Sequence, residues 1–102
     1  MSVARRKNHK ESGIMFKKMM NYIKNFLDNT PSDIYDFSCN LEGLLIVHYD
    51  KMHDEQPRAT EILNDEVPYI CATGEPGMSK DEIEEFKKQL RKEYDRAMKA
   101  VV

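Results

Sequence analysis

Cysteine, glycine and proline are scarce in this sequence of 102 residues, and it has no long apolar run. There are two cysteines, four glycines and four prolines, and the longest apolar runs are only 44–47 and 69–72. Because a helix needs about 20 consecutive apolar residues to cross a bilayer, we expect no membrane-spanning segment. Cys39 and Cys71 lack CxxC spacing, so we expect reduced thiols rather than a disulfide framework or a metal pair.

The motifs that usually accompany catalysis are also missing. No serine or cysteine stands beside a histidine in the spacing of a nucleophile and its base, and there is no glycine-rich phosphate loop. The one cluster with metal-ligand residue types is 48–54, but His48 and His53 are five residues apart and point about 140° from each other on a helix. We therefore expect no enzyme activity, no metal site and no cofactor.

The N-terminal segment is basic. Residues 1–14 include Arg5, Arg6, Lys7 and Lys10 without helical periodicity, which is typical of a flexible tail. The sequence that follows, FKKMMNYIKNF, is too charged for the apolar part of a secretory signal, so we expect a cytoplasmic protein. Residues 15–102 are expected to form a single domain.

Apolar residues recur at helical spacing in most of this domain. Residues 15–27 predict an amphipathic helix. Residues 31–54 predict a second, central helix, because its apolar surface is wider than one stripe. We expect it to begin with Thr30 as cap and Pro31 in the first helical position. Gly43 in its middle suggests that another helix crosses closely there.

The second half of the domain predicts shorter helices followed by a long one. A short helix is expected after Pro57, and another around residues 65–71 with Pro68 in its opening turn. Residues 72–77 read as a loop. Ser79 and Glu82 have the spacing of a capping box, which predicts the start of the final helix. The fold class is therefore all-α, a small bundle of four or five helices.

The net charge of −2 conceals an uneven distribution. Residues 1–27 carry +6, residues 28–85 carry −12 and residues 86–102 carry +4. Such an acidic block is often only a solvated face. It also suits recognition of a basic partner, since a negative surface speeds encounter and discriminates between partners, with nearby aromatic residues as anchors. The expected partner-binding residues are Tyr49, Asp50, Asp54, Glu55, Glu61, Asp65, Glu66 and Tyr69.

The helix pattern and the charge resemble a known family. The acidic block YDKMHDEQPRATEILNDEVPYI, followed by the charged helix DEIEEFKKQLRKEYDRAM, is similar to bacterial immunity proteins of the colicin D type over residues 31–98. The resemblance implies a protein that binds and neutralises a cognate toxin nuclease with a basic surface. It also implies a role for the acidic residues, which would stand in for nucleic-acid phosphates: Asp50, Asp54, Glu55, Glu61, Asp65 and Glu66.

Two other functions are compatible with the sequence. The first is a small nucleic-acid-associated regulator that uses the basic residues Arg5, Arg6, Lys7, Lys10, Lys17 and Lys18. The second is a subunit of a helical homo-oligomer, in which a second copy completes the apolar stripe of the helix at 15–27. The sequence leaves the oligomeric state open.

Overall fold

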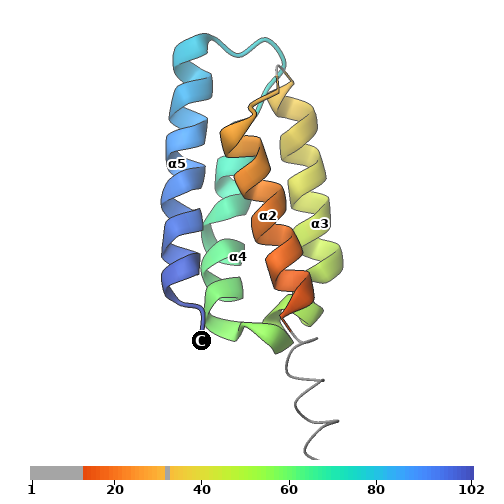
Figure 1. Cartoon of the computed structure of the whole chain (residues 1–102). Coiled ribbons are helices and arrows are strands. Elements are labelled where there is room, and N and C mark those ends of the chain that lie inside the picture. Colours follow the sequence, from red (N-terminus) through yellow and green to blue (C-terminus); the bar gives the residue numbers. More distant parts are fainter. Residues whose placement is uncertain (1–12, 32) are drawn as a thin grey trace, which may run out of the picture.

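The computed structural model describes residues 13–31 and 33–102, which form four helices (Figure 1). These are α2 (Ile14–Asp28), α3 (Ile34–Glu55), α4 (Pro57–Ala72) and α5 (Lys80–Lys99). Successive helices run antiparallel, and each packs against two neighbours in the ring α2, α3, α4, α5. The predicted all-α bundle is confirmed. The predicted basic tail lies outside the described residues except for Gly13, the N-cap of α2, and Ile14, which begins that helix.

The apolar stripe of α2 is buried inside this bundle. Its buried residues are Phe16, Met19, Met20, Ile23, Phe26 and Leu27. Phe26 stacks on Phe37 of α3 with ring centroids 3.7 Å apart, and Phe86 of α5 meets the edge of this pair at 5.8 and 6.3 Å. The stripe is therefore covered by helices of the same chain. The expectation that a second copy completes it is wrong.

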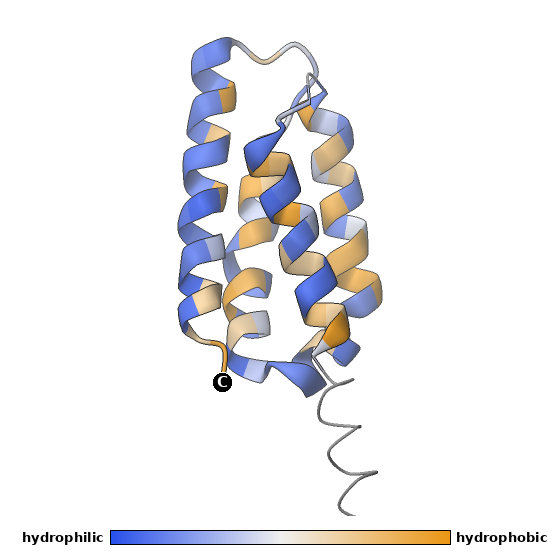
Figure 2. Cartoon of the chain, in the orientation of Figure 1, coloured by the Kyte–Doolittle hydropathy of each residue, from blue (hydrophilic) through white to orange (hydrophobic). Residues whose placement is uncertain are grey.

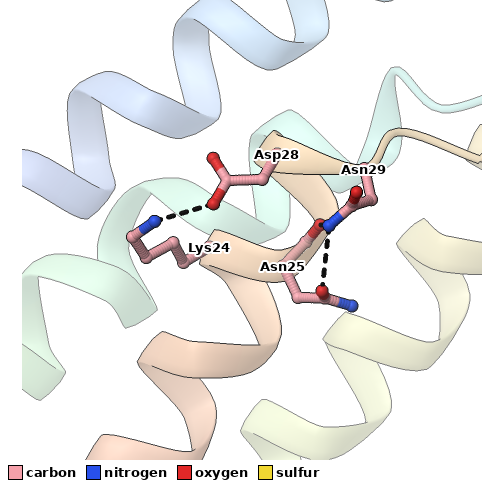
Figure 3. A network of polar contacts seen from close by, with 4 residues as sticks. All are labelled: Lys24, Asn25, Asp28 and Asn29. Atoms are coloured by element: carbon pink, nitrogen blue, oxygen red, sulfur yellow. Dashed lines mark hydrogen bonds and ion pairs between the residues drawn. The ribbon is translucent and has the colours of Figure 1, made fainter.

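The α2 helix ends in two side-chain contacts at i, i+4 spacing (Figure 3). Lys24 Nζ donates to Asp28 Oδ2 at 2.7 Å, and Asn29 Nδ2 donates to Asn25 Oδ1 at 3.2 Å. The hydrogen bond from Lys24, with its charge, lowers the pKa of the Asp28 carboxyl. Because this ion pair is exposed, it adds little to stability.

The α3 helix begins three residues later than the sequence suggested. Its N-cap is Asp33, whose Oδ1 accepts from the Asp36 amide at 2.8 Å. Thr30, the expected cap, instead donates its hydroxyl to the Phe26 carbonyl at the end of α2. Pro31 therefore lies in the connection, outside the first helical turn. The aspartate provides the cap because its carboxylate accepts an orphan amide in the first turn.

The α3 helix is also not central. Ile46 and Val47 are 77% and 73% exposed, and Tyr35 is 49% exposed. Figure 2 shows that much of the visible side of α3 is hydrophobic, whereas α5 is largely hydrophilic. In a ring of four helices each member has one outer side, and this part of the apolar surface of α3 lies there. Gly43 faces outward, and a Cβ there would meet nothing within 4 Å, so no close helix crossing explains it.

The α4 helix is continuous where two short helices were expected. It runs from Pro57 in its first position through Pro68 in its interior to Ala72. An internal proline costs about 3 kcal/mol because it removes a helical hydrogen bond. Packing outweighs this cost, since one buried stripe runs along both sides of Pro68: Ala59, Leu63, Val67 and Ile70. The prediction that a second short helix starts near residue 65 is wrong.

The connection from α4 to α5 is held by specific contacts. A Cβ on Gly74 would lie 2.9 Å from the Cβ of Ser38 on α3 and closer still to its hydroxyl, so the loop backbone packs directly on that helix. Gly77 has φ +74°, a conformation that glycine adopts without strain. The capping box is confirmed: Ser79 Oγ accepts from the Glu82 amide at 3.1 Å, and Glu82 Oε1 accepts from the Ser79 amide at 2.7 Å.

Candidate protein-binding surface

Most of the expected partner-binding residues lie on the surface. Six of the eight side chains are exposed: Asp50 and Asp54 on α3, and Glu61, Asp65, Glu66 and Tyr69 on α4. Tyr69 is 75% exposed, which is unusual for so large an aromatic residue. Tyr49 is half-buried at the edge of α3.

Glu55 differs from the other carboxylates because it is only 8% exposed. Its Oε1 accepts from the Phe16 amide at 2.7 Å, and its Oε2 accepts from the Met15 amide at 3.3 Å. These amides belong to the first turn of α2, where no side chain of α2 itself provides a cap. Glu55 thus caps a helix 39 residues away in sequence, and the expectation that it belongs to an exposed acidic surface is wrong.

Residues near the α3–α4 turn form a small cluster that joins the two helices. The rings of Tyr49 and His53 lie 5.4 Å apart, and His53 Nε2 lies 3.5 Å from Glu61 Oε2. Asp50 and Asp54, which share a helical face at i, i+4, lie on the outer side of α3 beside this cluster. The cluster places Glu61 next to the acidic end of α3.

The outer side of α4 carries the other expected residues in a row. Glu61, Asp65 and Tyr69 follow one another at i, i+4, so they share one face. Glu66 is turned from this row towards α5. The continuity of α4 across Pro68 keeps these four side chains on one helix.

A groove of about 450 Å³ separates the C-terminal half of α4 from the N-terminal half of α5. Its α4 wall is Glu66, Tyr69 and Thr73, and its α5 wall is Glu82, Glu85 and Gln89. Its floor is apolar and consists of Ile70, Met78 and Phe86. The Glu85 carboxylate accepts from Gln89 at 2.7 Å, which holds both side chains of the α5 wall together.

The α5 carboxylates were not among the residues expected from the sequence. Glu82 and other acidic residues at the start of α5 are explained by capping and by the helix dipole, so they gave no separate functional signal. The useful signal was the spacing of residues 82, 85 and 89, which share a face, together with the antiparallel packing of α4 on α5. This packing sets that face beside Glu66 and Tyr69.

The acidic residues of the groove have no cationic neighbour in the part of the chain that the structure describes. There, no lysine, arginine or histidine nitrogen lies within 4.0 Å of the carboxylates of Glu66, Glu82 or Glu85. The described part of the chain also contains no group of three or more histidine, cysteine or acidic side chains that could hold a metal ion. None of its helices is both long and apolar enough to span a membrane.

The basic residues of the alternative nucleic-acid reading are only partly described. Lys17 and Lys18 are exposed on α2, whereas Arg5, Arg6, Lys7 and Lys10 lie outside the described residues.

The apolar outer face of α3 borders a shallow hollow lined by Tyr22, Cys39, Asn40, Gly43, Leu44 and Val47.

Comparison with known proteins gives no match to a family model, a curated protein or a solved structure. The resemblance to immunity proteins of the colicin D type therefore remains a prediction from helix order and charge.

Proposed function

We propose that this chain is a binding protein that inhibits a basic partner, as an immunity protein inhibits its toxin, and that it binds through the outer side of α4. One observation carries the proposal: Glu61, Asp65, Glu66 and Tyr69 are all exposed on a single continuous helix. Carboxylates at such positions attract a cationic surface, and an exposed tyrosine provides contact area that salt does not weaken.

The chemistry suits a partner whose own site is built for nucleic acid. A nuclease active site is basic because it binds phosphates, and a row of carboxylates fits the same cations. Asp50 and Asp54 on α3 extend the acidic area, and Glu61 links it to α4 through its contact with His53. Inhibition then follows from occupation of the phosphate sites, without any chemical step.

A charge-reversal triple mutant tests the proposal. Tagged chain is used to recover partners from the source cells at low salt, and the recovered protein is assayed for nuclease activity with and without added chain. The variant Glu61→Lys/Asp65→Lys/Glu66→Lys is compared with Asp36→Lys/Glu84→Lys/Asp95→Lys, which changes the net charge equally on exposed residues elsewhere.

We expect the wild-type chain and the control variant to retain a basic partner and inhibit it, with affinity that falls as salt rises. The α4 variant is expected to bind at least about tenfold more weakly, since it replaces attraction by repulsion at three positions. Equal inhibition by all three proteins, or recovery of a partner that is not basic, would overturn the proposal.

A further inference from the structure

The groove between α4 and α5 combines two kinds of surface. Ile70, Met78 and Phe86 form an apolar floor, and carboxylates stand on both walls, Glu66 on one and Glu82 and Glu85 on the other. Its volume of about 450 Å³ is within the range of ligand-binding clefts. A purely cationic ligand makes no use of the floor, and a purely apolar one makes no use of the negative charge on the walls.

The charges on the two walls favour a cation between them. Glu66 comes from α4 and Glu82 and Glu85 from α5, so like charges face one another across the groove. Like charges repel, and a positive group placed among them is attracted to the carboxylates of both walls. Tyr69 lies on the same wall as Glu66, and its exposed ring is suited to a cation–π contact with lysine or arginine.

We propose that this groove binds an amphipathic basic helix of a partner protein, with apolar side chains on the floor and a lysine or arginine between the two walls. The inference rests on the proposed function, since it identifies the part of the basic partner that contacts α4. It adds the α5 wall and the apolar floor to the binding surface.

Three synthetic peptides test the proposal on the full chain. The first is an 18-residue amphipathic helix of leucine and lysine, of about five turns. The second has the same lysines with serine in place of leucine, and the third has the same leucines with glutamate in place of lysine. Binding is followed by backbone amide NMR shifts, which report on Ile70, Thr73 and Met78 separately from the outer side of α4.

We expect the first peptide alone to shift the groove amides. The variant Gln89→Trp fills the groove without changing the charge and is expected to weaken binding at least about tenfold, by analogy with the cost of overfilling a packed site. The matched variant Asn64→Trp adds the same side chain to an exposed position of α4 that does not line the groove and is expected to leave binding unchanged.

The results separate the groove from the proposed function. If the serine peptide binds as well as the first, or Gln89→Trp has no effect, the groove proposal is overturned, while the inhibition assay still decides the function. If spermidine produces the same shifts at the same concentration, the site takes small polycations and the proposal is overturned. Groove binding by the first peptide, abolished by Gln89→Trp, supports it even if no nuclease is inhibited.

Discussion

The carboxylate of Glu55, at the end of α3, accepts a hydrogen bond of 2.7 Å from the backbone amide of Phe16, in the first turn of α2. A negative charge in the last turn of a helix is unfavourable for that helix, whereas the same charge at the start of another helix is favourable. The contact therefore stabilises the packing of α2 on α3 at the expense of the end of α3.

Removal of this carboxylate is expected to destabilise the bundle. Glu55→Ala leaves two amides of α2 without an acceptor and should lower the free energy of unfolding by about 2 kcal/mol. Glu55→Gln retains a neutral acceptor and should lose about half as much. Chemical denaturation measures both, with the exposed neighbour Asp54→Ala as control. If Glu55→Ala were no less stable than this control, the cap would contribute nothing.

Replacement of Gly43 is expected to stabilise the protein. Its backbone is helical without a positive φ, and an added Cβ meets no atom within 4 Å. Gly43→Ala should therefore raise the free energy of unfolding by about 0.5–1 kcal/mol, the usual difference between these residues in a helix. The denaturant midpoint should rise with an unchanged slope. A fall in the midpoint would contradict the open space described at this position.

Gly74 is expected to behave in the opposite way. Gly74→Ala places a methyl group against Ser38 and should destabilise by about 1–3 kcal/mol. The Ser38 hydroxyl is buried without a hydrogen-bond partner, so Ser38→Ala alone should cost little. In the double mutant the loss of stability should be smaller than the sum of the losses in the two single mutants, because the Ser38 hydroxyl that crowds residue 74 is absent. Additive effects in a double-mutant cycle would contradict direct packing.

The two cysteines are expected to differ in reactivity. Cys39 is exposed, whereas burial of Cys71 raises the pKa of its thiol to about 12. Because the thiolate is the reactive form, an alkylating reagent at pH 8 should label Cys39 quickly and Cys71 only when the protein unfolds. Mass spectrometry of the labelled peptides measures both rates. Rapid labelling of both residues in the folded protein would contradict the burial of Cys71.

The Cys71 thiol should also lower the free energy of unfolding as the pH becomes alkaline. The pKa of Cys71 lies near 9 in the unfolded chain and at about 12 in the folded one, so above pH 9 the unfolded chain binds fewer protons. The contribution of the Cys71 thiol to the free energy of unfolding is fully present below pH 9 and is lost as the pH rises towards 12. Cys71→Ala should flatten the decline that begins near pH 9. The decline that Tyr22 adds near pH 10 should remain, because burial also raises the pKa of its hydroxyl from 10.0. If the free energy of unfolding fell equally with pH in the wild type and in Cys71→Ala, this linkage would be contradicted.

Signals confined to a few neighbouring residues were sufficient to predict much of the fold. The stripe of α2, the proline at the start of α4 and the capping box of Ser79 and Glu82 each depend on contacts within one or two turns. The start of α3 was misplaced because Thr30 and Asp33 are both good caps, and only the structure shows that Thr30 closes the preceding helix.

The features that sequence reasoning missed depend on contacts between distant segments. Glu55 reads as one more exposed carboxylate until α2 is placed beside the end of α3. The helix passes Pro68 because the buried stripe continues on both sides of it, a tertiary effect that outweighs local propensity. Glu85 lines the same groove as Glu66 only because α4 packs against α5, and the sequence alone does not reveal this packing.

Because α4 is continuous, its exposed side chains are held at fixed distances from one another. At a rise of about 1.5 Å per residue, the positions from Glu61 to Tyr69 span roughly 12 Å along an axis that cannot shorten or bend freely, since both ends are packed into the bundle. A flexible acidic loop would adjust to any arrangement of cations. Under the proposed function, we expect this surface to favour a partner whose basic side chains are set at a matching interval, so the stiffness of α4 would discriminate among basic proteins of similar charge.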